Sequence, residues 1–147
     1  MIAFRSSTKE DLPRVMDIWR GAVDATHGFL SAHDRRAIEA EVSELFPQLK
    51  LDLAVDQGDT PQGFMYLHAG HLEALFVDPH EQRKGIGRSL VGRALADNPK
   101  LTVDVNEQNE MGLKFYETMG FERIGRSSCD GQSRPYALIH LRHRCED

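Results

Sequence analysis

The sequence predicts a single mixed α/β domain spanning residues 1–147, and three observations lead to this prediction. The length of 147 residues is close to the commonest size of one domain and lets about two thirds of the unfolded surface become buried. Segments of helical and strand periodicity alternate without repeats, low-complexity tracts or a linker. One strand-like segment, residues 71–78, is followed by a glycine loop and a helical segment, which is typical of a strand-to-helix crossover.

The N-terminal half predicts one strand, two helices and then a group of strands. After a strand at residues 2–5, the pattern Ser7–Glu10 is a possible capping box, and Pro13 suits the first turn of the helix that follows. A second helix is expected to begin after Ser31 and to be interrupted by Pro47. Three further strands are expected at residues 51–55, 64–69 and 71–78.

The C-terminal half predicts two helices, a strand and a closing hairpin. A helix over residues 89–98 leads to a strand at 101–105. The next helix is expected over Glu107–Met119, closed by Gly120. Residues 121–128 and 135–143 are expected to form the hairpin.

Composition excludes several classes of function. The chain is 28% charged and 40% hydrophobic, and no window approaches the ~20 apolar residues that cross a bilayer. A net charge of -5 argues against a general nucleic-acid binder, because such binders neutralise phosphates with clustered Lys and Arg. The N-terminus does not resemble a secretion signal, so we expect a cytoplasmic protein. Cys129 and Cys145 lack the spacing of a zinc site and are expected to be reduced thiols, with no metal bound.

The loop Gln82–Ser89, with the sequence QRKGIGRS, is the most unusual local feature. It is not a P-loop, because Lys84 precedes the glycines, and it is not a dinucleotide fingerprint, because Leu90 occupies the position of the third glycine. Glycines nevertheless allow a ligand close to the backbone, and the first turn of a helix attracts anions. The loop is therefore either a phosphate-binding site or a surface turn with solvated cations.

A second motif decides between these alternatives. Residues 106–126 contain Asn109 and Tyr116, which lie seven residues apart and so share one face of the predicted helix. The combination of ALFVDP, QRKGIG and this Asn-x6-Tyr helix resembles the GCN5-related N-acetyltransferase (GNAT) superfamily, and within it a subgroup of small bacterial acetyltransferases. Gly112 departs from the family, which usually has alanine there, at a cost of roughly 1 kcal/mol of helix stability.

The resemblance implies a fold and a cofactor site. The fold is a twisted, mostly antiparallel sheet of about six or seven strands flanked by about four helices. The co-substrate is acetyl-CoA, whose pyrophosphate would be held by the glycine loop and whose pantetheine arm would lie along the preceding strand and against Asn109. The cofactor-binding residues are then Leu75, Phe76, Val77, Gln82, Arg83, Lys84, Gly85, Ile86, Gly87, Arg88, Ser89, Asn109 and Phe115.

Acetyl transfer to an amine needs a proton donor for the departing thiolate and a proton acceptor for the amine. Tyr116 is the expected acid, because a phenol of pKa ~10 lies close to a thiol of pKa ~8.5. His71 and Glu73 lie two residues apart on one strand face and are the candidate bases. A structural histidine at position 71 and a base acting through water remain as alternatives.

The segment between the first two helices supplies candidates for acceptor binding. In this superfamily the corresponding region forms one wall of the acceptor pocket, so Asp24, His27 and Phe29 are the expected substrate-binding residues. The alternative is local structure, because Asp and Thr favour turns and Ser31 caps the following helix. The remaining histidines, at positions 33, 68, 80, 140 and 143, show no constellation in the sequence.

Three functions are consistent with these residues. The first is an acetyl-CoA-dependent N-acetyltransferase acting on a small-molecule or peptide amine. The second is a non-catalytic acyl-CoA-binding sensor, which would need neither Tyr116 nor the His71 and Glu73 pair. The third, an interaction module without cofactor, is disfavoured by the intact glycine loop. We expect no nucleic-acid or membrane partner, and either a monomer or a homodimer paired through the hairpin edge.

Overall fold

The computed structural model of the protein describes residues 2–82 and 84–144. The chain forms two compact units. Unit 1 comprises Met1–Tyr66 and Ala74–Leu90, and unit 2 comprises Leu67–Glu73 and Val91–Asp147. Arg83 and Cys145, which carry predictions from the sequence, lie outside the described residues.

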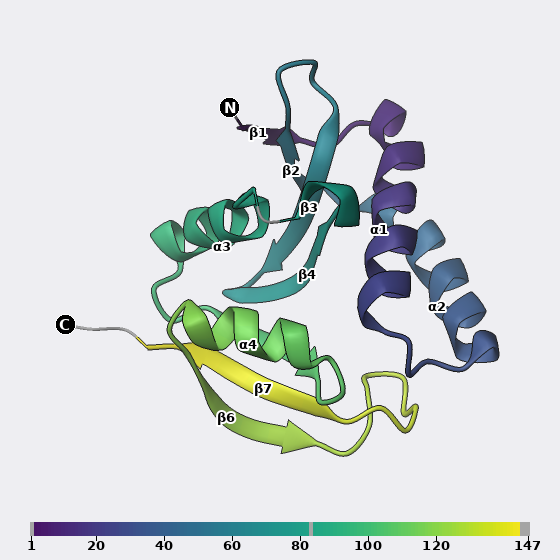
Figure 1. The fold of residues 1–147 in the computed structure, drawn as a ribbon, viewed down its shortest axis with the longest axis vertical. Helices are drawn as coiled ribbons and strands as arrows, with labels where there is room; N and C mark the ends of the chain where they lie inside the picture. The colour runs from purple at the N-terminus through teal and green to yellow at the C-terminus, as the bar shows by residue number, and fades with distance from the viewer. Residues whose placement is uncertain (1, 83, 145–147) are drawn as a thin grey trace. The chain divides into compact units, whose positions relative to one another are not determined.

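The structure confirms the predicted mixed α/β class, with a seven-stranded sheet and four α-helices (Figure 1). The strand order is β1-β2-β3-β4-β5-β7-β6. Of the strand pairs with a described register, only β4–β5 is parallel. The helices are α1 (Leu12–Thr26), α2 (Ala32–Leu45), α3 (Ile86–Asp97) and α4 (Glu110–Thr118). The strands are β1 (Ala3–Ser6), β2 (Asp52–Val55), β3 (Pro61–His68), β4 (His71–Val77), β5 (Thr102–Asn106), β6 (Phe121–Ser127) and β7 (Leu138–His143).

The core of unit 1 forms where α1 packs on the strands. The buried face of α1 contributes Val15, Ile18 and Trp19, and β2 adds Leu53 from the facing layer. These four side chains are at most 2% exposed. The predicted apolar periodicity of the first helix is therefore confirmed.

Two caps fix the helices of unit 1. Ser31 accepts a hydrogen bond from the backbone N–H of Asp34, as the sequence predicted for the start of α2. The first capping box differs from the prediction by one residue, because Thr8 and Asp11 form it in place of Ser7 and Glu10. The Ser7 hydroxyl instead accepts a hydrogen bond from the backbone N–H of Leu51, which removes it from the helix start.

Unit 2 is organised around the antiparallel strands β5, β7 and β6, over which α4 lies (Figure 1). The closing hairpin is thus confirmed. The last helix is shorter than predicted: it spans Glu110–Thr118, and Asn109 is its N-cap residue, so the prediction of a helix over Glu107–Met119 was wrong at both ends. The backbone N–H of Asn109 bonds the carbonyl of Asn106, which places the preceding residues in a turn.

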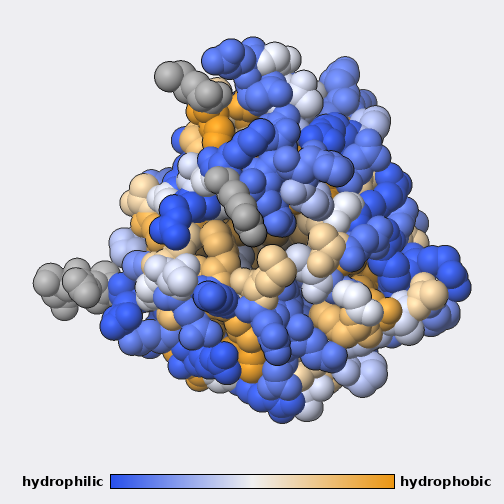
Figure 2. Space-filling view, viewed as in Figure 1, coloured by the Kyte–Doolittle hydropathy of each residue, from blue (hydrophilic) through white to orange (hydrophobic). Residues whose placement is uncertain are grey.

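Figure 2 shows hydrophilic residues over most of the visible face, with apolar residues in small patches. The large apolar side chains that are exposed among the described residues are Leu45, Met111 and Ile124. No helix in the described part of the chain is long and apolar enough to cross a membrane.

Candidate active site

The predicted site residues fall in both units. Unit 1 contains the end of β4, the glycine loop and the segment between α1 and α2. Unit 2 contains His71, Glu73, Asn109, Phe115 and Tyr116. That the two groups act on one substrate is a prediction that rests on the resemblance to the acetyltransferases.

The end of β4 is anchored to α1 by an ion pair whose carboxylate is buried and whose guanidinium is partly exposed. The guanidinium of Arg14 donates to Asp78 at 2.5 Å and to the carbonyl of Pro61 at 2.9 Å. Asp78 also accepts from the backbone N–H of His80. Burial alone would raise the pKa of Asp78, but the bonds from Arg14 and His80 outweigh it and lower that pKa. Asp78 is therefore ionised and held in place, and this fixes the point at which the chain leaves β4 and enters the glycine loop.

The glycine loop ends in a free helix N-terminus. The carbonyl of Gly85 accepts the N–H of Ser89, so α3 begins within the loop at Ile86, earlier than the sequence predicted. Among the described residues, the N–H groups of Ile86, Gly87 and Arg88 have no backbone acceptor within the helix, as is general for a first turn. Gly85 has φ +78°, a conformation that favours glycine. Such a terminus attracts an anion.

The apolar contacts of this loop explain a glycine in the neighbouring strand. Ile86 is 3% exposed, so its side chain is packed inside the protein. A Cβ atom at Gly63 would lie 3.0 Å from Cγ2 of Ile86 and 3.1 Å from the carbonyl oxygen of Phe76. Gly63 thus lets β3 lie close to both the end of β4 and the start of α3.

The exposed side chains of the loop carry positive charge. Lys84 and Arg88 are exposed, and Lys84 pairs with Glu81 three residues earlier. Gln82 and Ser89 are also exposed. These groups can add charge and hydrogen bonds to the backbone N–H groups, which is the donor set that a phosphate requires.

Asp24 is already paired in this structure. Its carboxylate accepts from the guanidinium of Arg35 at 2.9 Å, and Arg35 also pairs with Glu39 and lies 4.9 Å from the ring of Trp19. A cationic acceptor at Asp24 would therefore compete with Arg35. The contact links the end of α1 to α2 and agrees with the structural alternative for this residue.

His27 is a neutral imidazole with one defined tautomer. The Thr26 hydroxyl donates to the carbonyl of Ala22 at 2.8 Å, so it accepts from Nδ1 of His27 at 2.6 Å. The lone pair is then on Nε2. Burial lowers the pKa of His27, which keeps the ring neutral near pH 7. The ring lies 5.3 Å from that of Phe29, so these two predicted substrate-binding residues lie together.

Tyr116 is held in an aromatic cluster in unit 2. Its ring lies 5.0 Å from the Phe115 ring and 5.3 Å from the Phe121 ring, both in edge-to-face geometry. The residue is 7% exposed, and its hydroxyl bonds no other described residue. Burial raises the pKa of Tyr116 above its ordinary value, so the hydroxyl keeps its proton. A hydroxyl that keeps its proton can donate a hydrogen bond.

Asn109 and Gly112 form a single local unit. The amide oxygen of Asn109 accepts the N–H of Gly112 at 3.0 Å, which caps α4. A Cβ atom at position 112 would lie 2.5 Å from Nδ2 of Asn109. Glycine in place of the usual alanine thus makes room for the cap, and Nδ2 of Asn109 remains available as a donor.

His71 belongs to a network that the sequence did not predict. Its Nδ1 lies 2.6 Å from the Thr102 hydroxyl, and its Nε2 lies 3.4 Å from a carboxylate oxygen of Asp104. The other oxygen of Asp104 lies 2.5 Å from Nδ1 of His140. The prediction that His140 belongs to no constellation was therefore wrong. Glu73, two residues along β4, is exposed and bonds no other described residue.

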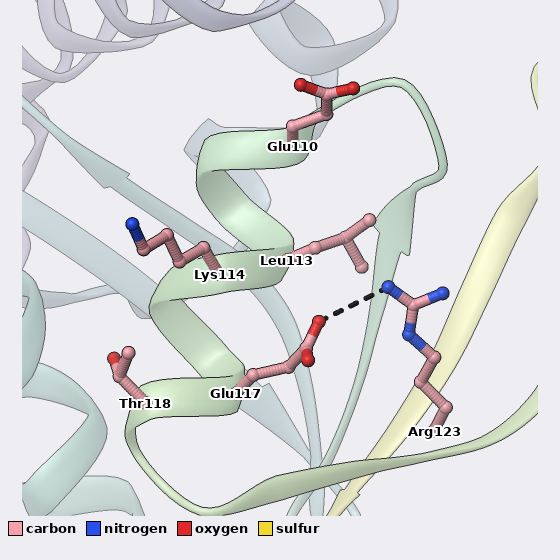
Figure 3. A pocket seen from close by; sticks show the side chains of 6 residues that line it. All are labelled: Glu110, Leu113, Lys114, Glu117, Thr118 and Arg123. Carbon is pink, nitrogen blue, oxygen red and sulfur yellow. Dashed lines mark hydrogen bonds and ion pairs between the residues drawn. The ribbon is translucent and has the colours of Figure 1, made fainter.

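A shallow depression of about 420 Å³ lies on the outer side of α4 (Figure 3). It is lined by Glu110, Leu113, Lys114, Glu117, Thr118 and Arg123. Figure 3 shows Glu117 reaching across it to Arg123, at 3.2 Å. None of the predicted catalytic residues lines it. In the described part of the chain, no three His, Cys, Asp or Glu side chains are grouped to hold a metal ion.

The mixed α/β fold with a seven-stranded sheet is that of an acetyltransferase family, and the family comparison agrees. The GNAT acetyltransferase domain family matches residues 22–134, so the chain belongs to this family and is an acetyltransferase.

Two curated relatives resemble almost the whole chain. The peptidyl-lysine N-acetyltransferase YjaB of Salmonella typhimurium is 45% identical over 141 residues, covering 96% of this chain and 97% of the relative. The protein of the same name from Escherichia coli K12 is 44% identical, with 96% of each chain covered.

Solved structures agree with the fold. The solution structure of apo-form YjaB from Escherichia coli superposes with a TM-score of 0.95 at 42% identity, covering 99% of both chains. The PaiA N-acetyltransferase of Thermoplasma acidophilum, solved in complex with coenzyme A, gives a TM-score of 0.76 at 21% identity, covering 97% of this chain and 99% of that one. The latter likeness concerns the fold alone.

Proposed function

We propose that the protein transfers an acetyl group from acetyl-CoA to the side-chain amine of a lysine in a peptide or protein. The choice of acceptor is supported by the 45% identity to a peptidyl-lysine N-acetyltransferase over 96% of the chain. A net charge of -5 also suits a cationic acceptor. The proposal is narrower than the prediction from sequence, which left small-molecule and peptide amines open.

The observation that most supports acetyl-CoA as the acetyl donor is the first turn of α3. Among the described residues, the N–H groups of Ile86, Gly87 and Arg88 have no backbone acceptor within the helix, and next to Lys84 they fit a pyrophosphate. The backbone at Leu75–Val77 would bind the pantetheine arm, as would the free Nδ2 of Asn109. Acetyl-CoA supplies the thioester carbonyl that a neutral amine attacks.

Tyr116 would act on the leaving group. Its protonated hydroxyl, which bonds no other described residue, can donate to the thiolate as the carbon–sulfur bond breaks. The amine must first lose a proton. His71 is the candidate acceptor, with Glu73 as a second, exposed carboxylate on the same strand face.

The first test is calorimetric titration with acetyl-CoA. Saturable binding is expected for the native protein and for Gly92→Val, whereas Gly87→Val should abolish it because a β-branched side chain would block the approach of the pyrophosphate. Gly92 is a matched control, since it lies in the same helix and a Cβ atom added there would meet no other atom within 4 Å. If Gly87→Val bound acetyl-CoA as tightly as Gly92→Val and the native protein, the loop would not be the phosphate site.

The second test is acetylation of lysine-containing peptides, followed by thiol release and mass spectrometry. Acetyl-lysine formed with native protein supports the proposal. Binding of acetyl-CoA without turnover on peptides or small amines would overturn it in favour of the acyl-CoA sensor.

A further inference from the structure

In unit 2, five polar side chains from the strands β4, β5, β7 and β6 form a continuous series of contacts. They are Thr102, His71, Asp104, His140 and Ser127, in that order. His140 joins the far end, since its Nε2 lies 2.6 Å from the Ser127 hydroxyl. The register of the strands produces this arrangement: His71 faces Thr102 across β4 and β5, and His140 faces Asp104 across β5 and β7.

The direction of each hydrogen bond follows from the carboxylate in the middle. An ionised Asp104 only accepts, so Nδ1 of His140 carries a proton and its Nε2 accepts from the Ser127 hydroxyl. By the same reasoning, the carboxylate favours a proton on Nε2 of His71, and Nδ1 accepts from the Thr102 hydroxyl. The competing acceptor for that hydroxyl, the Gly70 carbonyl, is farther away at 3.5 Å.

The two imidazoles contact Asp104 at different distances, 2.5 Å for His140 and 3.4 Å for His71. Each has one nitrogen directed at Asp104 and a lone pair occupied by a hydroxyl. The side chains of His71, Asp104 and His140 are 26%, 35% and 31% exposed, so protons can reach them while the contacts are partly shielded from water. A proton on either ring would be stabilised by the same single negative charge.

The charged groups around this network are few. On β7, Arg142 lies two residues from His140 and faces Thr102. On β6, Glu122 faces Arg142 and pairs with Arg144 at 3.4 Å. On β4, Glu73 lies two residues from His71. None of these has a hydrogen bond or ion pair with His71 or His140 among the described residues, whereas Asp104 contacts both.

We propose that Asp104 is a positioning residue shared by His71 and His140, and that this group of three side chains acts as one proton acceptor for the acetyl transfer. The inference rests on the proposed function for its link to catalysis. It extends the role of base from His71 alone to a coupled pair of histidines, one of which no pattern in the sequence singles out.

The proton balance is simple. An ammonium, directly or through water, passes a proton to the Thr102 oxygen while the Thr102 hydroxyl proton moves to Nδ1 of His71. The amine becomes neutral, the ring becomes an imidazolium, and no electrons change hands. Asp104 neutralises this first imidazolium. A second proton, on His140, would find the carboxylate already compensated, so the two rings should not charge independently.

The first experiment follows the ring protons of both histidines by NMR as pH is varied, in the native protein and in Asp104→Asn. In the native protein, we expect the protonation of each ring to be sensed by the other, because both contact Asp104. In Asp104→Asn, this coupling should be lost, since the carboxylate is gone. Glu122→Gln removes a charge from the same face without touching a histidine, and should leave the coupling in place.

Independent single-step titration of both rings in the native protein would overturn the shared site, whatever the activity. The second experiment measures kcat/KM against pH. Asp104→Asn should move the acidic limb to lower pH, because the carboxylate that stabilises the imidazolium is gone, with unchanged acetyl-CoA affinity. An unmoved limb in this variant would overturn the link to catalysis. Native protein without acetyl transfer would instead overturn the proposed function, a separate result.

Discussion

Tyr116 illustrates how burial changes the chemistry that a residue type suggests. The sequence predicted easy proton sharing between a phenol of pKa ~10 and a thiol of pKa ~8.5. Burial among aromatic rings raises the pKa of this phenol, which makes full transfer of its proton less favourable. We therefore expect a hydrogen bond to the developing thiolate, in place of full proton transfer, to be its main contribution.

Removal of that hydroxyl should impair turnover selectively. We expect Tyr116→Phe to lower kcat by ~10²-fold while acetyl-CoA affinity stays nearly constant, because the ring and its contacts with Phe115 and Phe121 remain. Steady-state kinetics and calorimetry measure the two quantities. Tyr136→Phe, which removes another buried phenol hydroxyl from unit 2, is the matched control. Native turnover in Tyr116→Phe would exclude it as the acid.

Asp11 should contribute stability that depends on pH. Hydrogen bonds from Arg5 lower the pKa of Asp11 to about 2, against an opposing effect of burial and with further support from the Thr8 N–H. Because the folded-state pKa lies below that of the unfolded chain, this stabilisation is present above pH ~4 and is lost as pH falls towards 2.

The test is urea unfolding of Asp11→Asn and native protein at several pH values. At pH 7 the variant should be less stable by on the order of 1 kcal/mol after allowance for solvent screening. The difference should disappear near pH 2. Asp59→Asn, which removes the more exposed partner of Arg5, should have a smaller effect. A difference that is independent of pH would show that the ion pair is not its cause.

At the level of elements, periodic segments could be predicted from the sequence and long-range contacts could not. The apolar face of α1, the Ser31 cap and the closing hairpin follow from local patterns. The start of α4 could not be predicted in the same way, because the residues around Asn109 are compatible both with a position inside a helix and with an N-cap position. The His140 network was also missed, because it depends on which residues of β5 and β7 face each other across 36 positions of chain.

The start of α4 offers a test of coupling between Asn109 and Gly112. Alone, Asn109→Ala should cost about 1 kcal/mol through loss of the cap. Gly112→Ala should gain about 1 kcal/mol of helix propensity but displace the Asn109 side chain, so the net change should be near zero. In the Gly112→Ala background, Asn109→Ala should then cost almost nothing.

Chemical denaturation of the four proteins measures this double-mutant cycle, with an expected coupling of about 1 kcal/mol. Gly92→Ala in α3 is the control, since its new methyl group would meet no atom within 4 Å and it should gain the full helix propensity. Additive effects at positions 109 and 112 would mean that glycine is not needed for the cap.

For the whole molecule, the two compact units raise the question of whether residues 1–147 behave as the single domain that the sequence predicts. Independent domains are usually joined by exposed linkers. Here the chain passes from one unit to the other within β3, within β4 and within α3. Unfolding of one unit would therefore interrupt a helix or strand whose remaining residues belong to the other unit.

We therefore expect one cooperative unfolding transition, with equal calorimetric and van't Hoff enthalpies. Two core variants sharpen the test: Leu53→Ala in unit 1 and Leu141→Ala in unit 2, both at fully buried positions, should each lose about 2–5 kcal/mol. In a single domain, each variant lowers the midpoint of the same transition, whether it is followed by calorimetry or by NMR signals from either unit. Two transitions, each shifted by only one of the variants, would instead identify two domains. Each unit would then need a core that is stable without the other.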